Sequence, residues 1–70
     1  MALNKIYEER EGDFKVIVYW DTAWQEYRVR FYTAGILEHD ADYYTIDRQD
    51  ALDTAAAILK GASAYANTTS

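Results

Sequence analysis

Two neighbouring segments, residues 14–20 and 25–32, constrain the fold of this chain more than any other feature. Both are rich in β-branched and aromatic residues, and the second alternates strictly between apolar and polar side chains. This alternation is typical of a strand that buries one face. With Asp21-Thr22-Ala23-Trp24 as the connecting turn, we predict an antiparallel hairpin.

The predicted hairpin has one apolar face and one mixed face. With this turn, the apolar pairs are Phe14 with Phe31, Val16 with Val29, and Val18 with Tyr27. The pairs on the opposite face are Lys15 with Arg30, Ile17 with Arg28, and Tyr19 with Glu26. The apolar face is therefore the predicted core side of a sheet.

The length of the turn after the second strand determines which side chains of the third strand lie on the core face. A two-residue loop at Ala34-Gly35 would place Glu38 and Asp40 on the core face, and burying unpaired carboxylates costs free energy. We therefore predict the three-residue loop Thr33-Ala34-Gly35, with Gly35 in the left-handed conformation that forms a bulge.

This longer loop pairs the arginines of the hairpin with acids. Arg30 then lies opposite Glu38, Arg28 lies opposite Asp40, and His39 lies on the helix-covered side. Each charge meets its opposite, although exposed ion pairs contribute at most about 1 kcal/mol each.

One helix should follow the strands. Asp47 is a typical N-cap with Asp50 three residues later, and Ile46 is placed to pack onto Ala51. The helix should begin near Arg48 and end near Lys60-Gly61, unless residues 62–66 prolong it. Its apolar stripe consists of Ala51, Leu52, Ala55, Ala56, Ile58, Leu59 and Ala62.

These elements predict an α+β fold. Residues 1–66 should form a single domain, a three- or four-stranded antiparallel β-meander with one C-terminal helix packed on its apolar face. The fourth strand would lie near residues 3–8, and residues 67–70 are expected to be a frayed polar tail.

The length of the chain limits its core. Seventy residues allow one domain, and the free energy gained from so small a core is close to the entropic cost of ordering the chain. The chain has no cysteine, so no disulfide can stabilise it. Association with a second copy is the remaining common remedy, and we expect a homodimer.

Two further patterns concern location. The start, Met1-Ala2-Leu3-Asn4-Lys5, lacks the apolar core of a signal peptide. No apolar run approaches the roughly 20 residues that a membrane span needs. We therefore expect a cytoplasmic protein that does not enter a membrane.

Acidic residues are concentrated between positions 38 and 53. This segment has six carboxylates against one base, Arg48, so its charge equals the net charge of −5 of the whole chain. We expect an acidic surface formed by Asp40, Asp42, Asp47 and Asp50, and an alternative function is that of an inhibitor that presents this surface as a phosphate mimic to a basic partner.

The sequence offers no catalytic or metal site. Glu38, His39, Asp40 and Asp42 contain metal-ligating atoms, but neighbouring strand residues point to opposite faces and cannot share one ion. His39 has no Cys or Ser at a recognisable spacing, and the three glycines form no phosphate loop. We expect no enzymatic activity, no catalytic residue, no metal and no cofactor.

The mixed face of the hairpin is the expected interaction face. It consists of Ile17, Tyr19, Arg28, Arg30 and Tyr32. With Tyr7 and Trp24, it leaves more aromatic surface than one helix can cover, which is typical of association. We therefore expect a non-enzymatic interaction module that uses this face or an edge strand to form a homodimer or to bind another protein.

Nucleic-acid binding is the alternative for the same face. Arginines beside tyrosines are the side chains that such surfaces use. The expected neighbours Glu26, Glu38 and Asp40, and an isoelectric point near 4.5, argue against it, because they repel phosphate.

Two resemblances add to this reading. Residues 14–60 resemble the DNA-binding AP2-type and integrase arm-binding domains in element order and in Trp24, Tyr27, Arg28, Arg30, Gly35 and the helix start Asp47-x-x-Asp50-Ala51. The resemblance implies DNA contacts at Arg28 and Arg30, but those families have a basic third strand where this chain has Glu38, Asp40 and Asp42. Residues 40–45 and 50–55 also resemble small proteins of marine cyanobacteria and their phages, which imply no activity.

Overall fold

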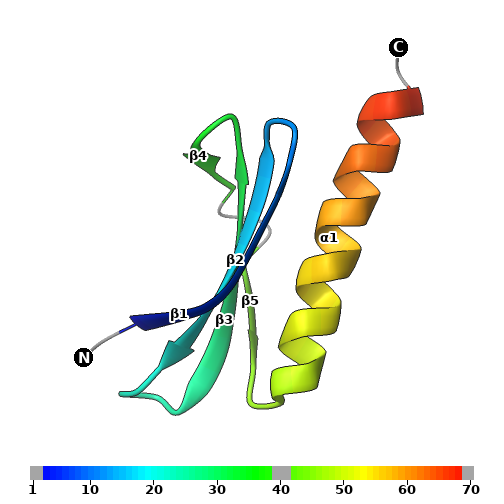
Figure 1. Ribbon diagram of the computed structural model, residues 1–70. Helices are drawn as coiled ribbons and strands as arrows, with labels where there is room; N and C mark the ends of the chain where they lie inside the picture. Colours follow the sequence, from blue (N-terminus) through cyan, green and yellow to red (C-terminus); the bar gives the residue numbers. More distant parts are fainter. Residues whose placement is uncertain (1–2, 39–41, 69–70) are drawn as a thin grey trace.

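The protein is an α+β fold in which one helix packs on one face of an antiparallel sheet (Figure 1). The computed structural model describes residues 3–38 and 42–68, with side chains up to residue 62. The elements are β1 (Leu3–Glu11), β2 (Phe14–Asp21), β3 (Glu26–Thr33), β4 (Ile36–Leu37), β5 (Tyr43–Thr45) and α1 (Arg48–Thr68). The predicted fold class is confirmed.

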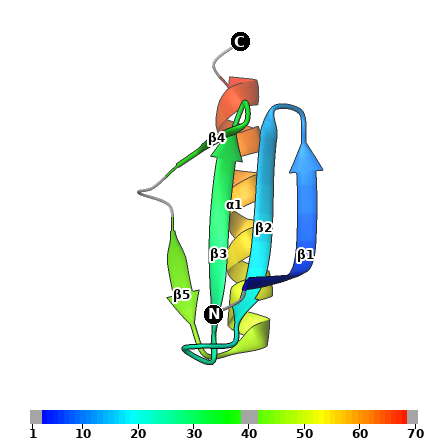
Figure 2. The same ribbon diagram turned by 90° about the vertical axis from the view of Figure 1, so that its left-hand side faces the viewer.

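The sheet is a meander with a divided edge. Its order is β1-β2-β3-β4, and β5 also pairs with β3. In Figure 2, β4 and β5 lie along the same side of β3, one after the other. The β4 residues pair with Tyr32 and Thr33, and the β5 residues pair with Tyr27, Arg28 and Val29. The expected N-terminal strand is present as β1, paired with β2.

The β2–β3 register differs from the prediction by two residues. Val16 lies opposite Phe31, and Val18 lies opposite Val29. Because side chains alternate with a period of two, this shift changes the pairs but leaves every side chain on its predicted face.

The side chain of Asp21 explains the shift. Its Oδ1 accepts hydrogen bonds from the backbone N–H of Ala23 (2.9 Å) and of Trp24 (3.2 Å). Asp21 therefore closes the turn and pairs with Glu26, and Gln25 takes a left-handed φ of 52°. An Asp at the first position of a turn commonly bonds backbone N–H groups two or three residues later.

The predicted three-residue loop after β3 is wrong. Thr33 pairs with Ile36, so the loop is Ala34-Gly35, with φ values of 52° and 83°. Two positive φ angles are typical of the tight turn that suits a two-residue hairpin. The sequence argument against this loop was that it would bury Glu38 on the core face. That argument fails because β4 ends at Leu37 and Glu38 is exposed.

The core lies between the sheet and α1. Its fully buried members are Val16, Val18, Val29, Ala51, Ala55 and Leu59, with Tyr7, Phe14, Tyr27, Leu52 and Ile58 partly buried against them. Small alanines on the buried side of α1 leave room for the sheet valines. Tyr7 therefore belongs to the helix side of the sheet and adds nothing to the opposite face, where the sequence interpretation had counted it.

The helix begins as predicted and continues further. Asp47 Oδ1 accepts the backbone N–H of Gln49 (2.9 Å) and of Asp50 (3.4 Å), which confirms the N-cap. Ile46 is 83% exposed, so it does not pack onto Ala51 as expected. The helix continues through residues 62–66, the longer of the two alternatives, and includes 67 and 68. Within the described residues, α1 lacks the apolar length that crossing a membrane requires.

Candidate functional site

Among the described elements none covers the surface of the sheet opposite α1, and we call this surface the open sheet face (Figure 1). Cross-strand partners share a face, so its members follow from the register. They are Leu3, Lys5, Glu8 and Arg10 on β1, Lys15, Ile17, Tyr19 and Asp21 on β2, Glu26, Arg28, Arg30 and Tyr32 on β3, Leu37 on β4 and Tyr44 on β5. Three strands, β1, β2 and β3, therefore contribute charged side chains or tyrosines to one surface, and β5 adds Tyr44.

Most of the cations of the chain lie on this face. Five of the seven Lys and Arg side chains are on it, against three of the eleven carboxylates in the described part of the chain. The face therefore has a formal charge of +2, and the other described residues have −6. A protein that is acidic as a whole thus has one locally basic surface.

Three of these cations lie over tyrosine rings. The pairs are Lys15 Nζ over Tyr32 (4.7 Å), Arg28 Cζ over Tyr44 (4.8 Å) and Arg30 Cζ over Tyr19 (5.5 Å), measured to the ring centroids. At exposed sites such contacts are worth about 0.5–1 kcal/mol each. They hold flexible side chains in place, so the charged groups are arranged before any partner arrives.

The three tyrosines of these cation–ring pairs differ in exposure. Tyr19 and Tyr32 are half-buried, and Tyr44 is 49% exposed. Burial raises the pKa of the Tyr19 phenol, with smaller contributions from Tyr32 in the same direction. The Tyr19 phenol therefore stays neutral at physiological pH and adds no charge to the face.

Arg28 is fixed by acids of its own hairpin. Its Nη2 lies 3.2 Å from Asp21 Oδ2, and its Nε lies 4.0 Å from Glu26 Oε1. Asp21 is only 4% exposed and also closes the β2–β3 turn. Arg28 is therefore bound within the fold, and its cross-strand neighbour is Tyr44 rather than the predicted Asp40, which lies outside the described residues.

Arg30 has a different environment from the predicted one. Its cross-strand neighbour is Ile17, and its guanidinium lies over Tyr19. Within the described residues no ion pair joins it to Glu38, because the two-residue loop places Glu38 beside Phe31, whose carbonyl oxygen accepts the Glu38 N–H at 2.8 Å. The predicted Arg30–Glu38 pair is wrong.

Arg10, Lys15 and Arg30 form what we call the cation cluster. Arg10 lies directly opposite Lys15, and Lys15 is a diagonal neighbour of Arg30 across β2 and β3. In the part of the chain that the structure describes, no ion pair involves any of the three. Glu8 is the acid of β1 on the same face, and its carboxylate is bound to Lys5 Nζ at 2.8 Å.

The nearby cations also affect the pKa of Glu8. The hydrogen bond from Lys5 lowers the pKa of the Glu8 carboxyl, and the charges of Lys5, Lys15 and Arg10 lower it further. Glu8 therefore remains ionised and compensates part of the positive charge on β1.

The five residues of the predicted interaction face lie together on the open sheet face. Ile17, however, is only 6% exposed, because its neighbours cover it. Trp24 is 69% exposed, but it lies in the β2–β3 turn rather than on a strand. The accessible part of the face is therefore charged and phenolic, apart from Leu3 at the start of β1, which is 37% exposed.

The predicted acidic surface is tied into the start of the helix. Asp47 caps α1, and Asp50 accepts a hydrogen bond of 2.6 Å from the Tyr43 hydroxyl, which raises the pKa of that phenol. Asp42 is half-buried, and its Oδ1 has no hydrogen-bond partner among the described residues. Asp40 and His39 lie outside the described residues. The described side chains include no group of three that could hold a metal ion.

Sequence reasoning did not place Arg10 or Tyr44 on this face, and it did not reveal that Lys15 has no ion pair among the described residues. Arg10 could have been found from its alternation with Glu8 along β1, but only once the β1–β2 register was known. Chemically, the arrangement offers fixed cations beside phenols, which bind anions. Comparison with protein-family models, with curated proteins and with solved structures found no match to this chain.

Proposed function

We propose that this protein is a non-enzymatic interaction module whose open sheet face binds nucleic acid through phosphate groups. The observation that carries the proposal is the concentration of five of seven cations on one face of a chain with a net charge of −5. Cations that serve only solubility are interspersed with acids over the whole surface. The separation of these cations from most of the acids favours an anionic partner at the open sheet face.

The cation cluster supports contact with phosphate in particular. Arg10, Lys15 and Arg30 have no carboxylate partner among the described residues, so their charges are available. A guanidinium binds phosphate oxygens through two parallel hydrogen bonds, and an ammonium adds a point charge. Contacts of this kind give affinity without reading sequence.

The tyrosines support the same kind of contact. Tyr19 and Tyr32 are half-buried, and each has a cation over its ring, so little ring surface is left for stacking on bases. Tyr44 is the most exposed ring of the face. We therefore propose binding dominated by the phosphate backbone, with weak preference among base sequences.

The geometry disfavours a homodimer built on this face. In a two-fold dimer the same patch meets itself, so the cation cluster of one copy would face that of the other. The aliphatic residue at the centre of the face, Ile17, is already buried. The phosphate-mimic alternative gains no support either, because Asp47 and Asp50 are engaged at the start of α1.

Fluorescence anisotropy with labelled mixed-sequence DNA and RNA, as single strands and duplexes, tests the proposal. Arg30→Gln should weaken binding several-fold and reduce the slope of log affinity against log salt by about 1, the effect of one lost phosphate contact. Lys60→Gln is the matched control, because it makes the same charge change on the exposed side of α1. It should leave both quantities unchanged.

The proposal fails if none of these nucleic acids binds with salt-sensitive affinity. It also fails if Arg30→Gln and Lys60→Gln weaken binding equally, since that result would mean that net charge acts without the open sheet face.

A further inference from the structure

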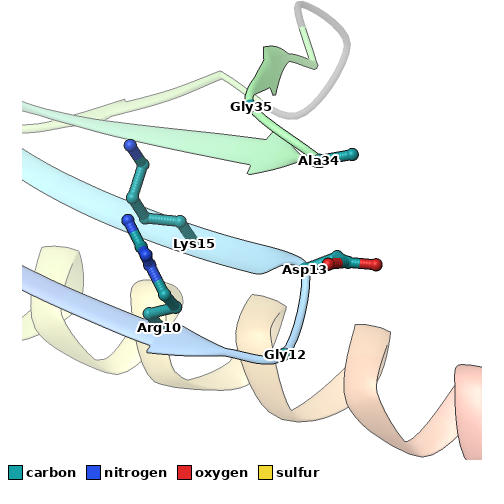
Figure 3. A pocket seen from close by; sticks show the side chains of 6 residues that line it. All are labelled: Arg10, Gly12, Asp13, Lys15, Ala34 and Gly35. Atoms are coloured by element: carbon teal, nitrogen blue, oxygen red, sulfur yellow. The ribbon is translucent and has the colours of Figure 1, made fainter.

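A shallow pocket lies at the end of the open sheet face where two hairpin turns meet (Figure 3). The β1–β2 turn and the β3–β4 turn are joined by a hydrogen bond of 2.8 Å from the Ala34 N–H to the Asp13 carbonyl oxygen. The lining residues are Arg10, Gly12, Asp13, Lys15, Ala34 and Gly35. The pocket thus combines two cations of the cluster with two tight turns.

Arg10 and Lys15 lie close together although their like charges repel each other. Arg10 and Lys15 are directly opposite each other in the β1–β2 ladder, and like charges at such positions destabilise a sheet. Figure 3 shows their side chains rising side by side, with the Asp13 carboxylate directed away from both. Neither has an ion pair with an acid among the described residues. An anion between them would remove the repulsion.

The two glycines of the turns have free space beside them. Gly12 and Gly35 have φ values of 60° and 83°, and a Cβ atom built at either would meet nothing within 4 Å. The space beside both turns is therefore free of protein atoms. Lys15 is held on the open face because its Nζ lies 4.7 Å from the centroid of the Tyr32 ring.

We infer that this pocket is a subsite for one phosphate group, held by the Arg10 guanidinium and the Lys15 ammonium. The inference deepens the proposed function and rests on it, since the phosphate would belong to the bound nucleic-acid backbone. The same chemistry would also accept free inorganic phosphate, which is therefore the simplest probe.

Amide NMR of the full ¹⁵N-labelled chain, titrated first with inorganic phosphate and then with a short DNA strand, tests the subsite. Phosphate should shift the amides of Gly12 and Gly35 in a saturable manner, while chloride at equal ionic strength should not. Arg10→Gln and Lys15→Gln should each abolish the saturable shifts. Lys60→Gln, with the same loss of charge on α1, should retain them. Both pocket side chains reach solvent, and retained amide dispersion verifies the fold of each variant.

The DNA arm separates this inference from the proposed function. A chain with both Arg10→Gln and Lys15→Gln should bind DNA several-fold more weakly than the parent. If DNA affinity is unchanged in that variant but falls in Arg30→Gln, the subsite is wrong and the proposed function stands. If phosphate shifts Gly12 and Gly35 but no DNA binds, the proposed function is wrong and the anion site stands. Shifts that never saturate, or that chloride reproduces, overturn the subsite.

Discussion

At the scale of single residues, Asp21 organises the site more than any cation does. One of its oxygens closes the β2–β3 turn, and the other lies 3.2 Å from Arg28. It is the only charged residue that is buried among those described. A single carboxylate therefore sets the register of the central hairpin and neutralises the arginine at its centre, which leaves the free charge of the face with Arg10, Lys15 and Arg30.

We predict that Asp21→Ala destabilises the protein by about 2 kcal/mol, because it leaves turn N–H groups and the half-buried Arg28 without their acceptor. Asp21→Asn, which retains an oxygen at the turn, should cost less. Urea unfolding followed by circular dichroism measures both. Asp53→Ala, an exposed carboxylate on α1, should remain within about 0.5 kcal/mol of the parent. Equal losses for Asp21→Ala and Asp53→Ala would contradict this role.

At the scale of elements, the faces could be predicted from the sequence, but the registers could not. Alternation in residues 14–20 and 25–32 fixes which side chains share a face, and a shift of two residues leaves that unchanged. The register depends on turn chemistry instead, namely the Asp21 side chain and the two positive φ angles of Ala34-Gly35. The sequence pattern also does not reveal that β4 ends at Leu37 and that β5 continues the same edge.

The free charges of the open sheet face were missed for the same reason. The prediction of Arg30 beside Glu38 required the three-residue loop, and the observed loop Ala34-Gly35 places Glu38 beside Phe31 instead. Arg10 entered no predicted pair, because β1 has no repeating pattern that sets its register against β2.

The β1 strand is also the element through which the predicted homodimer would form. It is nine residues long, pairs only with β2 among the described strands, and exposes Leu3 and Ile6. Long edge strands pair readily with other chains. Sedimentation at tens of micromolar should therefore give twice the mass of 8.1 kDa, in a form that leaves the open sheet face free. A monomer under these conditions would contradict the dimer.

At the scale of the whole molecule, the charge distribution orients any anionic partner. The open sheet face has a formal charge of +2 while the other described residues have −6. Asp47 and Asp50 lie at the start of α1, on the other side of the sheet, and salt screens charges over roughly 8 Å at physiological ionic strength. A polyanion is thus repelled from most of the surface and attracted to one face, which gives modest affinity with a defined orientation.

Chemical-shift mapping of the ¹⁵N-labelled chain with the nucleic acid that binds most tightly tests the central claim most directly. We predict that the perturbed amides and Arg Nε–H groups belong to residues of the open sheet face on β1, β2 and β3, including Arg10, Lys15 and Arg30, and that the exposed side of α1 around Lys60 is unaffected. Perturbations concentrated on α1, or none at saturating nucleic acid, would contradict the account.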